Sequence, residues 1–374
     1  MHVAVEATRL LREQRGIGRY VRAMLPRMAA ERATLRYTLF VKNKRDVRAL
    51  QEMIAADPTL ATRCEVQPVR RLRNATADVF WFPWNVVRPI PRRGPIVVTV
   101  HDAVPIALTP PGWRTWRKRR RWWGLYRDTA KHAAIMLADS TFTADELVRL
   151  LDAPRDRIRV VLLGADDRTV EEKSELATDA AVARLGVTAP FLLAVGADEP
   201  RKNFGVLYRA MQRITVARPG LTLVRVGPIA HRVSDFTTSA PWLYRLGFIG
   251  DDDLDALYRR AAVFVCPSTY EGFGLTVLEA MQRGAPVICA RASSLPEVAG
   301  TGAVFFSPDD DAVLAAELQR LLDDHGHRDT MIAAGRAHAA NFRWHDTALA
   351  TLAAFDDASA YFSSARTAPV APVA

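Results

Sequence analysis

The stretch YEGFGLTVLEAMQRGAPVICA, residues 270–290, carries the signals that decide the fold. An apolar run at 262–266 comes just before it and predicts a strand, and residues 275–283 have the period of a helix. A glycine and a proline end that helix, and the apolar run 287–290 predicts another strand. A strand, a helix and a strand in succession indicate a parallel sheet with helices on its faces.

The same alternation of strand-like runs and helix-period segments continues from end to end. The predicted strands are 2–6, 36–41, 78–82, 96–100, 134–138, 158–162, 191–195, 221–226, 245–249, 262–266, 287–290 and 303–306. These are too many strands for one sheet of this kind, so we expect an α/β protein with two doubly wound domains. If such domains face each other, their strand ends surround one cleft, and ligands bind at strand ends in open α/β sheets.

The domain boundary is expected in residues 165–189, which are polar and contain no strand-like run. The predicted parts are an N-terminal domain at 1–170, a linker at 171–189, a C-terminal domain at 190–345, a helix at 346–362 that could return to the first domain, and a disordered tail at 363–374.

Composition excludes several classes of protein. No apolar run in the 374 residues approaches the ~20 residues of a membrane span, and the first residues lack the pattern of a signal peptide. Cys64, Cys266 and Cys289 are far apart, without the spacing of a zinc site or a disulfide framework. We therefore expect a cytoplasmic protein without a structural metal.

Residues 113–132, WRTWRKRRRWWGLYRDTAKH, contain six Arg, two Lys and one Asp, and so carry most of the net charge of +10. One interpretation is a solvated helix face. Another is a site for an anionic membrane, because Trp113, Trp116 and Trp123 share an arc of the helix and Trp favours the membrane interface. Basic residues share the same arc, which makes the amphipathic character poor. Nucleic acid is the weakest interpretation, since nothing else in the chain resembles a nucleic-acid module.

The loop STYEGFG, residues 268–274, leads into the helix over 275–283. A glycine-rich turn at a helix start presents free N–H groups and suits a phosphate. The carboxylate of Glu271 would repel phosphate, but it can accept hydrogen bonds from hydroxyls, so a sugar phosphate satisfies both. Glu279 lies eight residues on, about 12 Å along a helix, which is too far for the acid pair of a glycosidase. An ordinary strand, turn and helix remains the alternative.

Three further candidates follow predicted strands or open a helix. Arg201 and Lys202 come after the strand 191–195 and could neutralise a leaving diphosphate, or form a solvated turn. His101 follows the strand 96–100 and could bind a substrate hydroxyl or cap its own strand. Gly16 and Gly18 form a flexible loop before a helix, but Val21 stands where a dinucleotide fingerprint needs its third glycine.

Taken together, these motifs resemble the family-four retaining glycosyltransferases. The matching segments, in family order, are GIGRY, VHDAVPI, ADSTFTADEL, VGADEPRKN, STYEGFGLTVLEAMQRGAPVICA and SSLPEV, and the resemblance spans about residues 1–350. The resemblance implies the GT-B fold, in which two doubly wound Rossmann-like domains face a central cleft. It also implies that the second domain holds most of a nucleotide diphosphate sugar.

The resemblance assigns roles to individual residues. It implies that His101, Arg201, Lys202 and Glu271 act at the reacting centre, with the two cations on the diphosphate and Glu271 on the sugar hydroxyls. Glu279 would bind the nucleotide ribose. The residues implied in donor binding are Gly16, Gly18, Phe248, Ile249, Gly272, Phe273, Gly274, Leu275, Thr276 and Glu279.

The resemblance further implies a metal-independent reaction with retention of configuration and no cofactor besides the donor. The variants GIGR and SSLPEV look like those of mannosyl- and rhamnosyl-type enzymes, which makes GDP-mannose the first choice of donor. The acceptor would be a saccharide or a lipid-linked saccharide, and the enzyme would then be peripheral at the inner face of the membrane. Alternatives are a UDP- or dTDP-sugar donor, a GT-B nucleotide-sugar epimerase and, ranked lower, a non-catalytic basic protein that binds membrane or nucleic acid.

Overall fold

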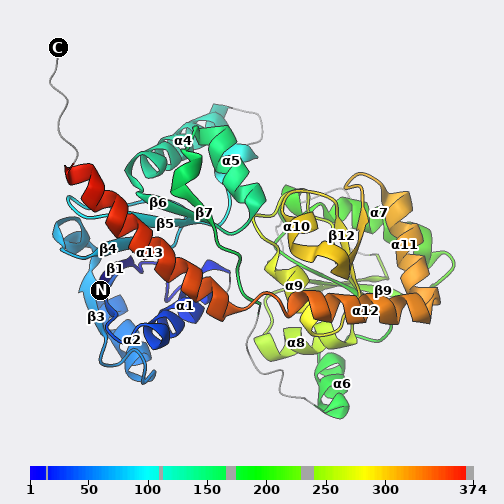
Figure 1. The fold of residues 1–374 in the computed structure, drawn as a ribbon. Coiled ribbons are helices and arrows are strands. Elements are labelled where there is room, and N and C mark those ends of the chain that lie inside the picture. The colour runs from blue at the N-terminus through cyan, green and yellow to red at the C-terminus, as the bar shows by residue number, and fades with distance from the viewer. Residues whose placement is uncertain (14–15, 109–112, 166–173, 229–239, 368–374) are drawn as a thin grey trace. The chain divides into compact units, whose positions relative to one another are not determined.

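The computed structural model describes residues 1–13, 16–108, 113–165, 174–228 and 240–367 (Figure 1). The chain divides into two compact units. Unit 1 comprises Met1–Gly164 and Trp344–Ala374, and unit 2 comprises Ala165–Arg343. Unit 1 is therefore built from both ends of the chain, whereas unit 2 is continuous.

Unit 1 contains a seven-stranded sheet in the order β3-β2-β1-β4-β5-β6-β7, in which every neighbouring pair is parallel. The strands are β1 (His2–Glu6), β2 (Arg36–Val41), β3 (Cys64–Pro68), β4 (Val79–Phe82), β5 (Ile96–Val100), β6 (Ile135–Ala138) and β7 (Ile158–Val160). The order reverses between β1 and β4, so two neighbouring strands send their connections in opposite directions along the sheet. Such a switch point opens a crevice at the carboxyl ends of the strands.

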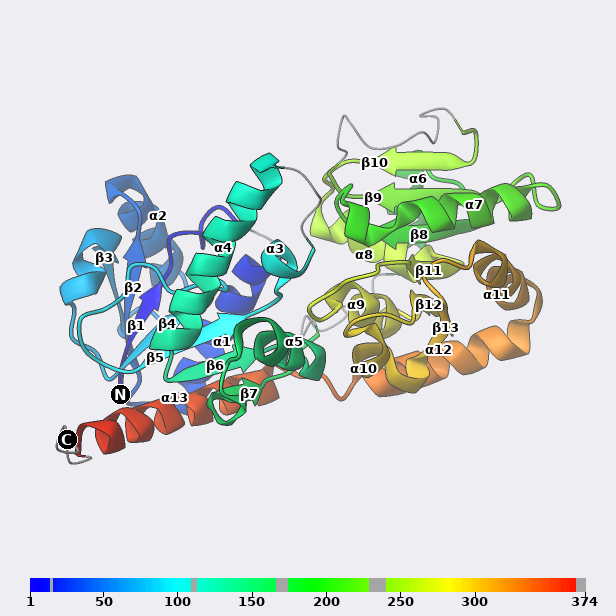
Figure 2. The ribbon, with the colours of Figure 1, turned by 90° about the horizontal axis from the view of Figure 1, so that it is seen from above.

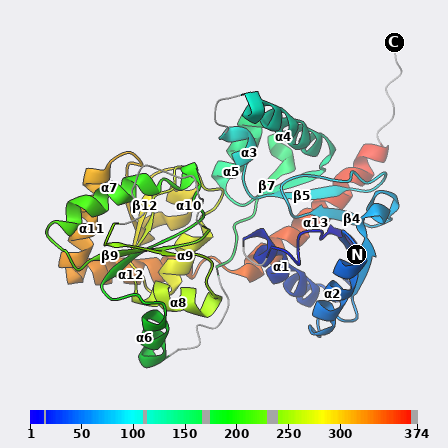
Figure 3. The same ribbon diagram turned by 180° about the vertical axis from the view of Figure 1, so that it is seen from behind.

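Helices cover both faces of this sheet because its central strands are apolar on both sides. The helical segments of unit 1 are α1 (Ile17–Glu31), α2 (Lys44–Ala55), η1 (Val69–Asn74), α3 (Val104–Ala107), α4 (Trp113–His132), α5 (Thr141–Leu151), η2 (Arg155–Arg157) and α13 (Trp344–Thr367). On one face Phe80 and Val98 pack with Tyr126 of α4. On the other face Trp81 contacts Phe355 of α13, with ring centroids 5.8 Å apart. Figure 3, seen from behind, shows α13 on the far side of the sheet.

Unit 2 contains a six-stranded parallel sheet in the order β10-β9-β8-β11-β12-β13. The strands are β8 (Phe191–Val195), β9 (Thr222–Val226), β10 (Leu243–Leu246), β11 (Val263–Cys266), β12 (Val287–Ala290) and β13 (Ala303–Phe306). The order reverses between β8 and β11, which places a second switch point in this unit. The prediction of two doubly wound α/β domains is confirmed, and the cleft between them stays a prediction.

The helices of unit 2 pack in pairs around the sheet. The helical segments are α6 (Glu175–Arg184), η3 (Pro200–Lys202), α7 (Phe204–Thr215), α8 (Asp251–Arg260), α9 (Leu275–Gln282), α10 (Leu295–Ala299), η4 (Gly300–Gly302), α11 (Asp311–Asp323) and α12 (His325–Ala339). Helix α7 packs on α11, as Figure 2 shows. Helix α9 packs on α12, and α6 packs on α8. Asp311 of α11 joins Arg209 and Arg213 of α7 at 2.9 and 2.7 Å.

The structure corrects the predicted boundaries in three places. The predicted linker 171–189 contains helix α6, and the part of this linker up to residue 173 lies outside the described residues. Helix α13 begins at Trp344 and ends at Thr367, so residues 363–367 of the predicted disordered tail are helical. The remainder of that tail, 368–374, is not described. The unit boundary falls at residue 164 rather than 170.

The structure also contains a strand that the sequence pattern did not predict, β3 (Cys64–Pro68). It lies at the edge of the sheet of unit 1, where the sequence CEVQP needs no apolar alternation. The strand predicted at 245–249 is shifted to β10 (Leu243–Leu246), the edge strand of unit 2. Edge strands bury fewer side chains, which weakens their apolar signal.

Candidate functional site

The loop between β11 and α9 has a conformation that depends on glycine and on two serines. Gly274 precedes α9 with φ 115°, and a Cβ there would come within 3.1 Å of Leu295. The hydroxyl of Ser294 donates to the carbonyls of Glu271 and Phe273 at 2.9 and 2.7 Å. The N–H of Glu271 donates to Ser293 Oγ at 2.8 Å. The SSLPEV segment therefore fixes the position of the glycine-rich loop.

Glu271, Arg201 and Lys202 are in direct contact. Lys202 Nζ lies 2.5 Å from Glu271 Oε1, and Arg201 Nη1 lies 3.0 Å from Oε2. The hydroxyl of Ser268 donates to Oε1 at 2.7 Å. Arg201 also donates to the carbonyl of Tyr270 at 3.1 Å. All three charged side chains are mostly buried, so their mutual attraction is little screened by solvent.

Electrostatics keep Glu271 ionised. Burial alone would raise the pKa of its carboxyl group, but Lys202 and Arg201, together with the hydrogen bond from Ser268, hold that pKa below its ordinary value. Two cations next to a carboxylate can share their charge with an incoming anion while the carboxylate accepts hydrogen bonds from hydroxyls.

This cluster lies at the switch point of unit 2. Arg201 and Lys202 are in η3, which follows β8, and Glu271 is in the loop that follows β11. Strands β8 and β11 are parallel neighbours, with Leu193 opposite Phe264. The segments after the two strands therefore leave the sheet at the same edge, which brings together residues 69 and 70 positions apart in the sequence.

Glu279 lies within α9 and is buried. Its Oε2 accepts a hydrogen bond of 2.9 Å from the hydroxyl of Tyr258 in α8, a partner that the sequence did not suggest. The ring of Tyr258 is in turn 5.5 Å from the guanidinium of Arg283. The carboxylate is thus oriented by a neighbouring helix.

The other predicted donor-binding residues of unit 2 lie around the same edge of the sheet. Leu275 and Thr276 form the first turn of α9, and the buried Gly272 is in the loop before it. The side chain of Phe273 packs inside the unit, with its ring edge-on to that of Phe342 and the two ring centroids 6.0 Å apart. A role of Phe273 in donor binding would therefore fall to its backbone. Phe248 and Ile249 follow β10, and Phe248 is 67% exposed.

His101 belongs to unit 1 and follows β5. Its Nε2 lies 3.0 Å from the carbonyl of Pro83 and its Nδ1 lies 2.6 Å from Asp139 Oδ2. Burial would lower the pKa of His101, but the carboxylate of Asp139 outweighs that effect and raises it. Both ring nitrogens therefore bind groups of unit 1. Asp139 is part of the segment ADSTFTADEL, but sequence reasoning had given it no role.

Gly16 and Gly18 lie at the start of α1, also in unit 1. Gly16 is exposed, with φ 57°. Gly18 is buried, and a Cβ on it would lie 1.6 Å from the carbonyl oxygen of Glu13. Position 18 therefore requires glycine, because the backbone of the segment before the helix leaves no space for a side chain there.

The basic segment predicted as a membrane site is helix α4. Residues 116–121 are all exposed, and Trp116 is 58% exposed. Trp122 and Trp123 instead pack against the core of unit 1. The predicted tryptophan arc is therefore split between solvent and core. None of the helices in the described part of the chain has the length and apolar character to cross a bilayer.

Comparison with known proteins identifies the chain's relatives. The family model described as Glycosyl transferases group 1 matches residues 177–338, and the model described as Glycosyltransferase Family 4 matches residues 15–169. O-antigen chain mannosyltransferase B of Escherichia coli is 29% identical, over 91% of this chain and 95% of that protein. MMP alpha-(1->4)-mannosyltransferase of Mycolicibacterium hassiacum is 29% identical, over 71% of this chain and 66% of that protein.

A solved structure supports the same conclusion at the level of the fold. Alr3699/HepE of Anabaena, solved in complex with UDP and glucose, is 17% identical and has a TM-score of 0.73, covering 94% of this chain and 98% of that chain. The two family models together span most of both units, and each unit has the doubly wound sheet described above. The chain therefore belongs to the group 1 glycosyltransferases and has the GT-B fold.

Proposed function

We propose that this enzyme transfers a hexose, with retention of configuration, from a nucleotide diphosphate sugar to a saccharide or lipid-linked acceptor. The observation that carries the proposal is the contact of Arg201 and Lys202 with Glu271 at the switch point of unit 2. The two cations would stabilise the charge that develops on the leaving diphosphate, and Glu271 would hold sugar hydroxyls. In this proposal the reaction needs no metal and no cofactor besides the donor.

The surroundings of the cluster are suited to the rest of the donor. The backbone from Gly272 to Thr276 opens helix α9, where N–H groups and the helix dipole favour phosphate oxygens. Glu279 would bind the ribose, and the backbone at Phe248 and Ile249 would border the base. His101, Gly16 and Gly18 would act on the donor from unit 1.

GDP-mannose is the proposed donor. Two of the relatives reported above carry the word mannosyltransferase in their names, which supports mannose as the sugar. A UDP- or dTDP-sugar is the alternative donor, and an epimerase acting on a nucleotide sugar is the alternative reaction.

A melting-temperature panel without metal tests the donor first. GDP, UDP, dTDP and ADP are each added to the full chain, since a ligand that binds only the folded state raises the melting temperature by mass action. A shift with GDP alone supports a GDP-sugar, and a shift with UDP or dTDP overturns that choice. No shift with any of the four contradicts the proposal that unit 2 binds a nucleotide.

The reaction is tested with GDP-mannose, an acceptor and a chelator present together. Retention is read from the anomeric configuration of the new bond by NMR. Turnover of the sugar without any acceptor would favour the epimerase instead. Loss of transfer when the chelator is added would contradict metal independence.

We also propose that the enzyme works in the cytoplasm as a peripheral protein at the inner face of the membrane. The exposed cations at 117–121 of α4 support a contact with anionic lipid, and Trp116 offers a side chain suited to the interface. Nucleic acid is the less favoured partner of this helix.

A further inference from the structure

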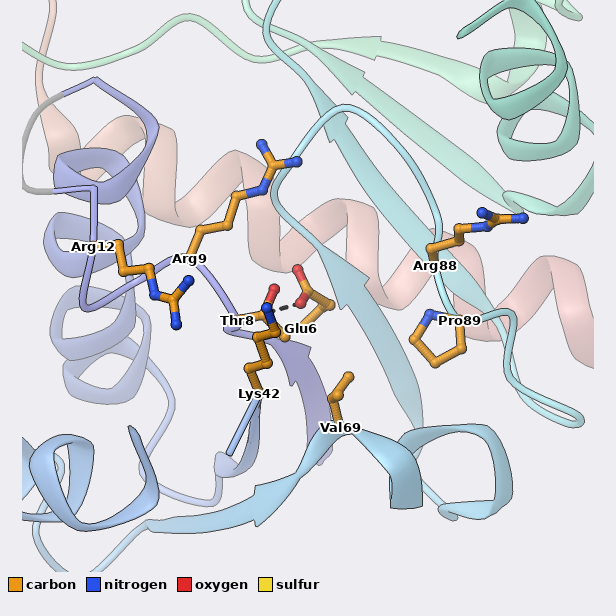
Figure 4. Close-up of a pocket in the computed structure, with 8 residues that line it drawn as sticks. All are labelled: Glu6, Thr8, Arg9, Arg12, Lys42, Val69, Arg88 and Pro89. Atoms are coloured by element: carbon orange, nitrogen blue, oxygen red, sulfur yellow. Dashed lines mark hydrogen bonds between the residues drawn. The ribbon is translucent and has the colours of Figure 1, made fainter. Parts of the chain in front are cut away.

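Unit 1 contains a hollow of about 530 Å³ that none of the roles above uses (Figure 4). Figure 4 shows Glu6 and Thr8 near its centre, with cationic side chains around them. The residues that line it are Glu6, Thr8, Arg9, Arg12, Lys42, Val69, Arg88 and Pro89. All of them belong to unit 1.

The hollow lies at the switch point of unit 1. Glu6 is the last residue of β1, and the other lining residues lie in the segments that come after four neighbouring strands, namely β3, β2, β1 and β4. These strands are parallel, so the segments leave the sheet at one edge. Open α/β sheets bind ligands at this place, and in unit 2 the corresponding place holds the cluster of Arg201, Lys202 and Glu271.

The charge of the hollow selects an anion. Its lining contains four cations, Arg9, Arg12, Lys42 and Arg88, and one carboxylate, that of Glu6. Among the described residues outside the lining, the acidic partners of Arg9 and Arg12 are Glu13 at 3.7 Å and Asp46 at 3.9 Å. In the part of the chain that the structure describes, Lys42 and Arg88 form no ion pair, and both are exposed. Such cations are available to a phosphate.

Glu6 gives the hollow a second type of contact. It is 6% exposed, and its Oε1 accepts a hydrogen bond of 3.1 Å from the N–H of Thr8. Burial raises the pKa of its carboxyl group, against the opposing effects of Thr8 and Arg9. A buried acid among arginines and a lysine can bind a hydroxyl next to an anionic group, which is the combination that a phosphorylated sugar presents.

We propose that this hollow, at the carboxyl ends of β1, β2, β3 and β4, binds a phosphate or diphosphate group of the acceptor, with Glu6 on a neighbouring hydroxyl. The identification of the ligand as the acceptor rests on the proposed function, in which unit 2 binds the donor. The acceptor is therefore an anionic compound and not a neutral oligosaccharide. Its phosphate belongs either to a lipid headgroup or to a soluble sugar phosphate.

The test measures binding of inorganic pyrophosphate to the full chain by calorimetry, with GDP present to occupy unit 2. The pocket variant is Lys42→Gln with Arg88→Gln, chosen because neither side chain forms an ion pair with another described residue. The matched control is Arg92→Gln with Arg93→Gln, two exposed arginines between β4 and β5 that do not line the hollow.

We expect the pocket variant to bind pyrophosphate about tenfold or more weakly than wild type, because each lost cation removes a charge-assisted hydrogen bond. The control should bind like wild type. Equal affinity in the pocket variant, or no binding by wild type, would overturn the proposal.

The GDP-induced rise in melting temperature separates this proposal from the donor assignment. The pocket variant should keep that rise, because the hollow and the cluster are in different units. If wild type shows no rise, the donor assignment fails, but loss of pyrophosphate binding in the pocket variant still reports on the hollow. A pocket variant that loses both would overturn the assignment of the anion to a separate site.

Two competitors identify the source of the phosphate. One is phosphatidylcholine vesicles containing a polyprenyl diphosphate, and the other is soluble mannose 1-phosphate. Displacement of pyrophosphate by the vesicles supports a lipid-linked acceptor, and displacement by mannose 1-phosphate supports a soluble one. If neither displaces it, the hollow does not bind an acceptor phosphate and the proposal fails.

Discussion

At the scale of single residues, Lys202 binds Glu271 and is also proposed to bind the leaving diphosphate. Lys202→Ala should lower kcat by about 10²- to 10³-fold, the usual cost of one group that stabilises transition-state charge. Steady-state kinetics with GDP-mannose measure this. Arg213→Ala, which removes a surface cation from α7, is the control and should retain activity. Wild-type turnover of the Lys202 variant would remove this residue from the mechanism.

The ion pairs of Glu271 also predict a dependence of stability on pH. Because the folded protein lowers the pKa of this carboxyl group from 4.5, the pairs stabilise the fold above about pH 4.5, and the stabilisation is lost as the pH falls further. Glu271→Gln should therefore be less stable than wild type at neutral pH, and the difference should shrink in acid. Urea unfolding at several pH values measures this. A difference independent of pH would contradict the argument.

Glu279 is predicted to act on the nucleotide and not on the reacting centre. Glu279→Ala should weaken GDP binding about tenfold or more, because a hydrogen bond to a charged group is lost. Tyr258→Phe removes the hydroxyl that orients this carboxylate and should cause a smaller loss. Calorimetry with GDP compares the two variants. Unchanged affinity in Glu279→Ala would contradict the ribose role.

The sequence motifs predicted that Arg201, Lys202 and Glu271 would lie at strand ends, and the contact between them follows from the pairing of β8 with β11. The supporting residues could not be predicted in the same way. Ser294 and Tyr258 act across segments that meet only in the fold, and Asp139 reaches His101 from 38 positions away. A single sequence contains no signal for such pairs.

At the scale of elements, α4 offers a direct test of the membrane contact. Replacing the basic residues at 117–121 with Gln should release the protein from anionic vesicles, because each cation contributes about 1 kcal/mol near such a surface. Sedimentation with phosphatidylserine vesicles measures this, and neutral vesicles are the control. The helix should remain intact, since Tyr126 and its neighbours hold it to the core. Failure of the wild-type protein to bind these vesicles would contradict the membrane hypothesis.

Elements with a strong apolar period were the easiest to predict, and the missed ones have weak patterns. Helix α6 buries only Thr178 and Val182, so its sequence ELATDAAVAR resembles a linker by periodicity. Its strong helix formers and the Ser174 cap, whose Oγ accepts a hydrogen bond from Ala177, were the available signals. The edge strand β3 has no such signal, because tertiary pairing alone makes it a strand.

At the scale of the whole molecule, each unit has one switch point and one cluster of charges at it. Alternating strands and helices predict the two sheets, because every parallel pair needs a crossover connection. The order of the strands within each sheet depends on tertiary structure, so the alternation of strands and helices does not predict it. The hollow in unit 1 could therefore not be predicted from the sequence, because Glu6, Lys42 and Arg88 belong to no common motif.

The return of the chain to unit 1 through α13 predicts that stability and donor binding can be changed separately. Phe355 of α13 is fully buried against Trp81, so Phe355→Ala should lower the free energy of unfolding by about 3–5 kcal/mol through the cavity it leaves. The GDP affinity of the folded protein should stay close to that of wild type, because the donor cluster is in unit 2. Urea unfolding and calorimetry measure the two quantities. A loss of GDP affinity as large as that of Glu279→Ala would show that the packing of α13 also controls the donor site.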